Sequence, residues 1–293
     1  MLALFFIRFL LFICCDYLDY TTKLYKFIMS DSSHPLTVLV TGAAGGLGRV
    51  IATAFLENGN NVAICDVNKD RLSETSALWE NKYPNRFMLQ QADVSSIPEM
   101  EAYVQAIVDK FGHLDILINN AAILDKFEPA GTCSLDMWNR ILNVNITGPF
   151  ICSKVAVNQM LAQSPPGGSI INLGSNASIC GTDGGLAYTV SKHGVLGLTR
   201  STAAYYLDQG ITCTMVQLGG LAQTNIQDSM AHGFDEKGVG LIDKHMGGFD
   251  YDVNAVPLED VAKFCVFLSS NREIALTMNG ASVPFNRNWP AGH

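Results

Sequence analysis

Short apolar runs alternate with longer stretches of helical period from residue 37 onward. The runs are rich in β-branched side chains and nearly unbroken, which is typical of strands buried on both faces of a parallel sheet. These runs are TVLVT (37–41), NVAIC (61–65), RFMLQQ (86–91), LDILINN (114–120), GSIINLG (168–174) and ITCTMVQL (211–218). The spacing of apolar residues predicts helices at 47–58, 69–82, 97–111, 134–162, 187–208 and 258–270.

Strand and helix in regular alternation predict a doubly wound α/β fold, with a parallel sheet, right-handed crossovers and helices on both faces. The chain has no solenoid repeat, no low-complexity tract and no Pro/Ser-rich linker. We therefore expect one domain, covering residues 29–293.

Residues 221–256 interrupt the alternation. The segment is rich in glycine and carries Met230, Phe234, Met246 and Phe249. A long, partly apolar segment after a late strand favours a mobile flap over a substrate pocket. An ordinary surface excursion is the alternative.

The first 28 residues form a separate apolar extension. Residues 2–15 are strongly apolar but contain Arg8, and they are fewer than the roughly 20 residues that a membrane-spanning helix needs. A basic start and a small-residue cleavage site, which a signal peptide requires, are not evident. The extension is either dispensable or a membrane-surface anchor, and the chain from Met29 onward would fold without it.

Composition limits the classes of partner. The formal net charge is -8 and no Lys/Arg-rich run occurs, which argues against nucleic-acid binding. None of the 8 cysteines forms a C-x-x-C pair. They indicate buried thiols in a reducing, cytoplasmic setting rather than disulfides or a metal site. Cys180 lies near the candidate site described below, either as a reactive thiol or as a passive neighbour.

A glycine cluster directly follows the first apolar run. Glycines between a strand and a helix allow a tight turn and a close approach of the backbone to a pyrophosphate, which the helix start would bind. The residues of this candidate cofactor loop are Thr41, Gly42, Gly46, Leu47 and Gly48.

Asp66 ends the second run, where a carboxylate can accept hydrogen bonds from a ribose diol. The same carboxylate would repel a 2′-phosphate, which predicts NAD rather than NADP. Arg49 is the nearby basic residue that would weaken this preference. A structural role as a turn residue at the strand end is the alternative for Asp66.

Tyr188 and Lys192 are four residues apart on a predicted helix, so their side chains share a face. A nearby ammonium favours the phenolate and would lower the pKa of Tyr188 toward neutrality. Ser175, thirteen residues upstream of the tyrosine, would hold a substrate oxygen. These three residues form a candidate acid/base site.

Taken together, these motifs resemble the short-chain dehydrogenase/reductase family, which has a Rossmann fold, over nearly all of residues 36–285. The glycine loop fits its Thr-Gly-x-x-x-Gly-x-Gly pattern. Further matching segments follow in the same order: Asp93-Val94, Asn119-Asn120-Ala121-Ala122, Asn143-Val144-Asn145, and then Ser175, Tyr188 and Lys192.

The resemblance implies a catalytic tetrad and a nicotinamide cofactor. Tyr188 would be the general acid/base, Lys192 would bind the nicotinamide ribose, Ser175 would orient the substrate, and Asn145 would hold a water of the proton relay. It also implies a homodimer or homotetramer packed through the long helices at 134–162 and 187–208. The implied cofactor contacts beyond the glycine loop and Asp66 are Asp93, Val94, Asn120, Ala121, Lys192 and Gly219.

Three departures from the family pattern affect the nicotinamide side and the C-terminus. Leu218-Gly219 replaces Pro-Gly, the following threonine is displaced to Gln223-Thr224, and the C-terminal Asp-Gly-Gly is absent, with residues 286–289 in that region. We predict an NAD-dependent enzyme that interconverts a secondary alcohol and a ketone. The alternatives are a dinucleotide sensor or scaffold with little turnover, and a membrane-associated dehydrogenase of lipid or steroid alcohols.

Overall fold

The computed structural model describes residues 34–221, 224–247 and 249–289. Seven parallel strands form its sheet in the order β3-β2-β1-β4-β5-β6-β7. Their bounds are β1 Thr37–Thr41, β2 Asn61–Asp66, β3 Phe87–Gln91, β4 Ile116–Asn119, β5 Gly168–Leu173, β6 Ile211–Leu218 and β7 Ser282–Phe285. The expected doubly wound parallel sheet is confirmed.

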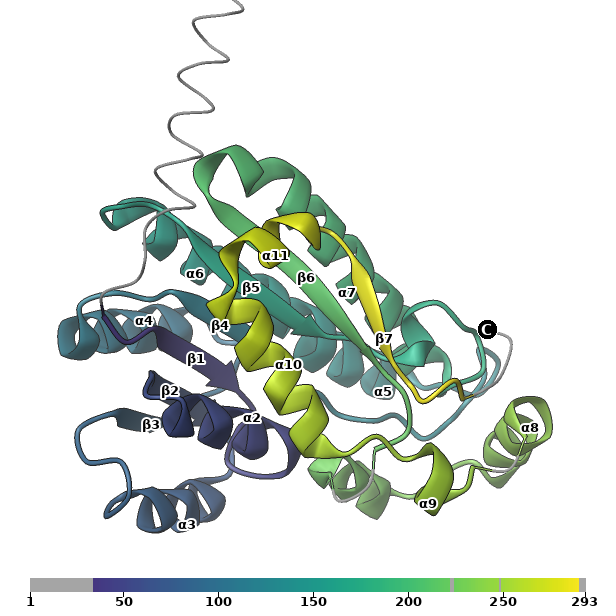
Figure 1. Cartoon of the computed structure of the whole chain (residues 1–293). Coiled ribbons are helices and arrows are strands. Elements are labelled where there is room, and N and C mark those ends of the chain that lie inside the picture. Colours follow the sequence, from purple (N-terminus) through teal and green to yellow (C-terminus); the bar gives the residue numbers. More distant parts are fainter. Residues whose placement is uncertain (1–33, 222–223, 248, 290–293) are drawn as a thin grey trace, which may run out of the picture. The chain divides into compact units, whose positions relative to one another are not determined.

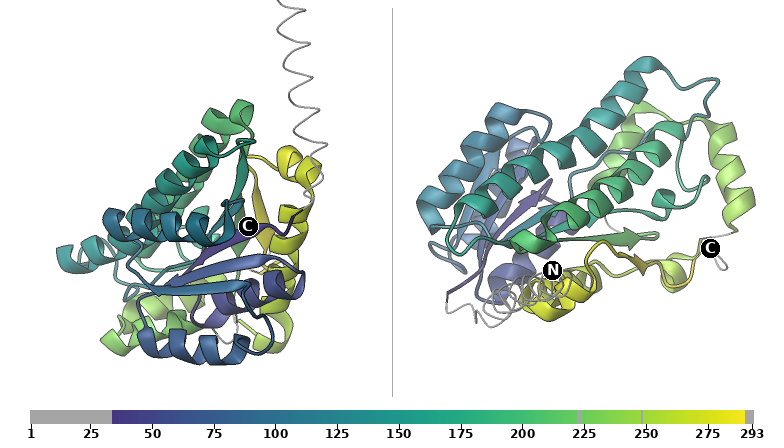
Figure 2. Two further views of the ribbon diagram at one scale, coloured as in Figure 1. Left: turned by 90° about the vertical axis from the view of Figure 1, so that its left-hand side faces the viewer. Right: turned by 90° about the horizontal axis from the view of Figure 1, so that it is seen from above.

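Helices cover both faces of the sheet, as Figure 1 and the right-hand view of Figure 2 show. On one face lie α2 (Gly46–Glu57), α3 (Lys69–Trp79), α10 (Leu258–Ser270) and α11 (Arg272–Thr277). On the other lie α4 (Ile97–Phe111), α6 (Gly148–Ala162) and α7 (Leu186–Tyr206).

Alternate strand residues supply the two cores. Val38 and Val40 of β1 point to the α2 side, whereas Leu39 between them points to the α4 side, and all three are fully buried. Burial of both faces explains why the strand sequences are continuous apolar runs. The two edge strands β3 and β7 are the exceptions: their residues are half-buried or exposed, because each has a neighbouring strand on one side only.

Three parts of the chain differ from the sequence expectation. The helix expected at 134–162 is divided into α5 (Leu135–Leu142), a π-helical turn η1 (Asn143–Thr147) and α6. Strand β7 and helix α11 were not expected. Residues 221–256 contain the 3₁₀ segment η4 (Asn225–His232) and the helices α8 (Glu236–Met246) and α9 (Tyr251–Asn254).

The strand order places a crevice at the carboxyl ends of β1 and β4. The chain leaves β1 toward β2 and β3 on one side, and continues from β4 to β7 on the other. In open α/β sheets such a switch point is where ligands bind. The short segments η2 (Asn176–Ser178) and η3 (Leu207–Gln209) flank α7, and η2 lies next to this crevice.

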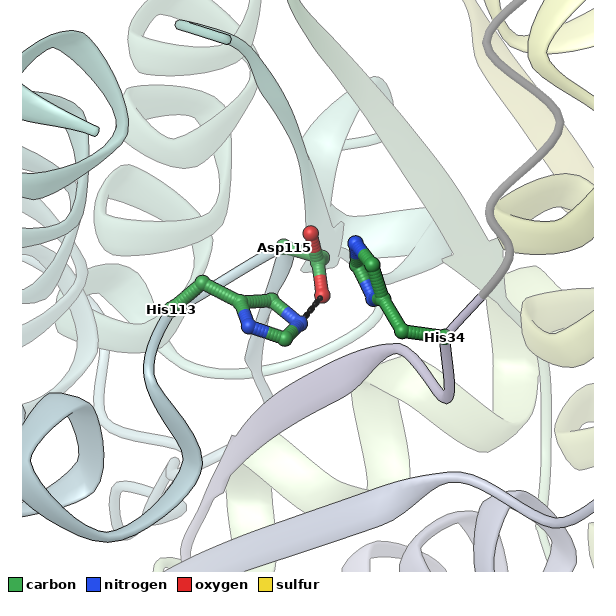
Figure 3. A group of neighbouring side chains, drawn as sticks. All are labelled: His34, His113 and Asp115. Carbon is green, nitrogen blue, oxygen red and sulfur yellow. Dashed lines mark ion pairs between the residues drawn. The ribbon is translucent and has the colours of Figure 1, made fainter. Parts of the chain in front are cut away.

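At the amino ends of β1 and β4, opposite the crevice, His113 Nε2 forms an ion pair with Asp115 Oδ2 at 2.9 Å (Figure 3). The same carboxylate accepts a hydrogen bond from the backbone N–H of Thr37 at the start of β1. The hydrogen bond to Asp115 raises the pKa of His113. The pair thus connects the amino ends of the neighbouring strands β1 and β4, away from the crevice. In the part of the chain that is described, no helix is both long enough and apolar enough to cross a bilayer.

Candidate active site

A cavity of about 750 Å³ opens at the carboxyl ends of the strands. Most of the predicted site residues line it, while Thr41 and Asn145 lie behind its wall. The predicted residues in the lining are Gly42, Gly46, Leu47, Gly48, Asp66, Asp93, Val94, Asn120, Ala121, Ser175, Tyr188, Lys192 and Gly219.

The glycine loop is attached to the end of β4 by a set of polar contacts. The Thr41 hydroxyl accepts the backbone N–H groups of Asn120 and Ala121, both at 3.1 Å. The Asn120 amide donates to the backbone oxygens of Thr41 and Gly42. Gly42 has a φ of +61°, and a Cβ there would lie 2.7 Å from Ala121 Cα. Thr41 and Asn120 therefore shape the loop, and only glycine fits at position 42.

Asp66 also holds this loop. Its carboxylate accepts the backbone N–H of Ala44 at 3.1 Å and that of Asn68 at 2.9 Å, while the residue lines the cavity. An ionised carboxylate has about four acceptor positions, so two remain for a ligand. Arg49, the nearby basic residue expected to weaken the NAD preference, does not line this cavity; it lines a separate groove between α2, α3 and α10.

The basic residue at this end of the cavity is Arg71, in the first turn of α3. Its guanidinium forms an ion pair of 2.6 Å with Asp228 of η4, which comes from the opposite wall. Both residues line the cavity. The position of Arg71, five residues after Asp66, was the sequence signal that could have found it. The ion pair connects η4 to the dinucleotide side of the fold.

A buried carboxylate sets the start of α7. Asp125 accepts the backbone N–H groups of Gly185 at 3.0 Å and of Tyr188 at 2.9 Å. A negative charge at a helix N-terminus satisfies free amides and complements the helix dipole. Asp125 thereby fixes the turn that carries Tyr188. Sequence reasoning missed this residue because it lies about 60 positions upstream of that turn.

Tyr188 and Lys192 lie in the same wall, but their electrostatics differ from the expectation. The Lys192 ammonium is 5.6 Å from the centre of the Tyr188 ring and donates to the backbone oxygen of Leu173. Burial raises the pKa of Tyr188 well above its ordinary value, and the hydrogen bond with Ser175 only partly opposes this. The expected lowering was therefore wrong for the protein alone. Burial also lowers the pKa of Lys192 to about 8.

Asn145 lies in the π-helical turn η1 and is buried. Its side-chain oxygen accepts the backbone N–H of Ile123 at 2.8 Å, and its amide donates to the Ile123 carbonyl and to the Ser191 hydroxyl. The Ser191 hydroxyl donates in turn to the backbone oxygen of Tyr188. Asn145 therefore connects the loop after β4 to the first turn of α7. Its predicted water-holding role stays a prediction.

Ser175 caps η2 and is bonded to a carboxyl group that the sequence reasoning did not identify. Its hydroxyl accepts the backbone N–H of Ala177 and donates to Asp183 Oδ2 at 3.2 Å. Asp183 lines the cavity, and burial raises its pKa to about 6. The sequence signal was a carboxylate five residues before Tyr188.

The raised pKa of Asp183 predicts that Asp183→Asn stabilises the fold at neutral pH. An acid whose pKa is higher in the folded state favours folding when protonated, and this contribution is lost as pH rises from about 4 to about 6. We expect the variant to exceed the parent by about 1–2 kcal/mol at pH 7.5. Urea unfolding at pH 7.5 and pH 4 checks this. A variant less stable than the parent at pH 7.5 would contradict it.

The far wall of the cavity comes from residues 221–256 and from the C-terminal segment. The rings of Phe249 and Trp289 meet edge-on, 4.7 Å apart, and the Trp289 carbonyl accepts a hydrogen bond from Asn176. Both aromatic residues line the cavity. The segment that replaces the expected Asp-Gly-Gly thus forms part of this wall. Whether residues 221–256 move as a flap stays a prediction.

The structure locates most of the residues that depart from the family pattern. Leu218 is buried in the core at the end of β6. Gly219 follows it and donates to the Phe285 carbonyl, and a Cβ at position 219 would lie 2.7 Å from Asn286 Cα. Thr224 lines the cavity, while Gln223 and residues 1–28 lie outside the described residues.

The fold and cavity define a nucleotide-binding α/β oxidoreductase with a Rossmann-type sheet. The chain belongs to the short chain dehydrogenase/reductase family, whose family model, described as short chain dehydrogenase, matches residues 36–233.

Similar proteins come from fungi and bacteria. The short chain dehydrogenase/reductase dpfgG of Gibberella zeae is 40% identical over 258 residues, covering 86% of this chain and 93% of its own. The 3beta-hydroxysteroid dehydrogenase 2 of Eggerthella lenta is 32% identical over 270 residues, covering 90% of this chain and all of its own. The crystal structure of levodione reductase superposes with a TM-score of 0.76 at 26% identity, covering 88% of this chain and 98% of that one.

Proposed function

We propose that this protein is an NAD-dependent oxidoreductase that interconverts a secondary alcohol and a ketone. One observation carries the proposal: Tyr188, Ser175 and Lys192 line the same cavity as the glycine loop and Asp66. An acid/base group and a dinucleotide-binding loop thus share one space, which a hydride-transfer enzyme needs.

The residues present fit a dinucleotide. A Cβ at position 48 would lie 2.5 Å from Asn120 Nδ2 and 2.7 Å from the Gly42 oxygen, so the first turn of α2 approaches the loop as closely as backbone allows. Asn225 lies against Gly45 and Gly46 at the start of α2, and a pyrophosphate would bind to the amides of this helix start beside it. Asp93, Val94 and Ala121 line the adjoining wall and would hold the adenine and ribose. A bound nicotinamide would give or accept the hydride.

Two features favour NAD over NADP. The Asp66 carboxylate faces the cavity with acceptor positions to spare for ribose hydroxyls, and it would repel a phosphate. Arg71, which would otherwise attract that phosphate, is neutralised by its ion pair with Asp228. The preference is thus set by one carboxylate and one arginine that is already paired.

The protein's own groups divide the proton chemistry. The Tyr188 phenol donates a proton to the substrate oxygen in reduction and accepts it in oxidation. Its raised pKa suits the donor form, since a phenol that holds its proton at neutral pH is ready to act as an acid. The Lys192 ammonium lies close enough to stabilise the phenolate that follows. Ser175 orients the substrate oxygen, and Asn145 holds the first turn of α7 in place.

The far wall favours an apolar substrate. Phe249, Trp289, Leu221 and Ile226 line this part of the cavity, and flat aromatic side chains suit ring compounds. A relative with 32% identity is named for a hydroxysteroid activity. A polycyclic secondary alcohol is therefore the class we would test first.

The cofactor proposal is tested by titrating NADH and NADPH, followed by fluorescence, into the protein and its Asp66→Ala variant. We expect at least tenfold tighter binding of NADH, and loss of the preference in the variant, because one unfavourable charge contact is worth about 1–2 kcal/mol. Arg49→Ala is the matched control and should leave both affinities unchanged. Equal binding of the two dinucleotides by the parent would refute the NAD preference.

Turnover separates the enzyme from its alternatives. Dinucleotide binding without turnover on a panel of secondary alcohols and ketones would favour the sensor or scaffold. Membrane partitioning that disappears when residues 1–28 are removed would favour the membrane-associated enzyme. Gel filtration with light scattering tests the implied dimer or tetramer.

A further inference from the structure

Asp183 is a carboxyl group on the substrate side of the cavity for which the proposed reaction has no use. It lies on the loop between η2 and α7, is half-buried, and lines the cavity beside Ser175 and Tyr188. The remaining carboxylates in the described lining belong to the dinucleotide side or to the ion pair with Arg71; they are Asp66, Asp93 and Asp228.

The Asp183 carboxylate keeps acceptor capacity after its contacts within the protein. It accepts the Ser175 hydroxyl and shares the Ala177 backbone N–H with Ser175 Oγ. About two of its four acceptor positions therefore remain. No Lys, Arg or His among the described residues forms an ion pair with it. A partly desolvated carboxylate without a cation is costly, so a donor on a bound molecule would be favourable.

The distance from Ser175 fixes where that donor must lie. The carboxylate oxygen is 3.2 Å from Ser175 Oγ. A reacting substrate oxygen bound to Ser175 would therefore lie about 5–6 Å from the carboxylate, since a hydroxyl hydrogen bond spans about 2.7 Å. A second hydroxyl on the adjacent carbon lies about 3 Å from the reacting oxygen. One hydrogen bond then spans the remaining distance from this hydroxyl to the Asp183 carboxylate.

We propose that Asp183 binds a second hydroxyl group of the substrate, on the carbon next to the reacting carbon or one further, so that the preferred substrates are 1,2- or 1,3-diols and the matching hydroxy ketones. The inference rests on the proposed function, because it places the reacting oxygen at Ser175. A neutral hydroxyl fits better than an ammonium group, since the Lys192 ammonium already lies beside Tyr188 and would repel a second cation.

The test compares matched substrates that differ by one hydroxyl: cyclohexanol with 1,2- and 1,3-cyclohexanediol, and 1-indanol with 1,2-indanediol. The parent should turn over the better diol of each set with a kcat/KM at least tenfold above that of the mono-alcohol, mainly through a lower KM. Asp183→Ala should reduce this ratio about 10- to 100-fold, the range for a hydrogen bond to a charged group. Asp183→Asn, which keeps the shape and one acceptor, should fall between the two.

Asp136→Asn is the control, because it removes an exposed carboxylate of α5 that does not line the cavity, and it should leave the ratio unchanged. NADH binding is measured for every variant. If the parent does not bind NADH, the proposed function itself is refuted. Three outcomes would overturn the role of Asp183 if the parent binds NADH: it shows no preference for diols, it turns over no diol, or it prefers 2-aminocyclohexanol.

A pH series adds a readout that a purely structural role would not move. The Tyr188 phenol and the Cys180 thiol interact electrostatically with Asp183, and the charged groups next to Tyr188 are Lys192 and Asp125. The titration of these groups changes kcat/KM equally for the diol and the mono-alcohol, so it does not change the ratio of the two values. The diol preference of the parent should fall between pH 7.5 and pH 5, as Asp183 takes up its proton. The ratio for Asp183→Asn should stay flat, and an equal fall in this variant would overturn the proposal.

Discussion

Tyr188→Phe should lower kcat by about 10³-fold while leaving NADH affinity within a factor of about three, since a positioned acid/base contributes about 10²- to 10⁴-fold. The substitution removes only the phenolic oxygen, and the buried ring keeps its packing against Gly184. Single-turnover kinetics with an alcohol of the polycyclic class, beside an NADH titration, measures both quantities.

Tyr205→Phe is the matched control for this experiment. Tyr205 lies on the same helix but is 76% exposed, so its hydroxyl should have no effect on kcat. If Tyr188→Phe retained more than a tenth of the parent's kcat, a group other than the phenol would have to move the proton. The proposed mechanism would then be wrong even if the cofactor proposal survived.

Gly48→Ala should weaken dinucleotide binding by about 100-fold or more and lower the free energy of unfolding by about 1–3 kcal/mol. The added methyl group would lie 2.7 Å from the Gly42 oxygen and 2.8 Å from Ala43 Cα. Both are backbone atoms of the glycine loop, so the loop must move away from its position over the helix start. NADH titration and urea unfolding measure the two effects.

Gly131→Ala supplies the comparison, because a Cβ at position 131 meets no atom within 4 Å and the backbone there is not left-handed. It should leave binding unchanged and stability nearly so. Equal NADH affinity for Gly48→Ala and the parent would show that the loop does not need its close approach to α2. The dinucleotide would then have to bind elsewhere.

Most of the sheet could be predicted because its strands are buried on both faces. The run TVLVT is short, β-branched and apolar at successive positions, a pattern typical of a strand buried on both faces rather than of an amphipathic helix or a half-exposed strand. The observed β1 begins and ends where the run does. The same logic failed for β7. It is four residues long, lies at the edge and contains Pro284, a residue that breaks the usual strand pattern but is tolerated at an edge.

The candidate site was only partly predictable, for a different reason. Residues that share a local motif, such as Tyr188 and Lys192, are brought together by helix geometry alone. Asp125 reaches the start of α7, and Trp289 reaches the cavity, only through tertiary packing, which leaves no local pattern. The ionisation of Tyr188 was mispredicted because spacing reveals the nearby ammonium but not the burial, and burial has the larger effect on its pKa.

The π-helical turn at Asn143–Thr147 has a consequence for how this helix tolerates insertions and deletions. A π-turn holds one residue more than a regular turn. Deleting one residue of this turn would restore regular hydrogen bonding and rotate the preceding helix by about 100° relative to the following one. The Asn145 amide could then no longer reach both Ile123 and Ser191. A more regular helix would therefore give a poorer enzyme, and natural length variation should spare these five residues while occurring freely in the exposed loop just before α5.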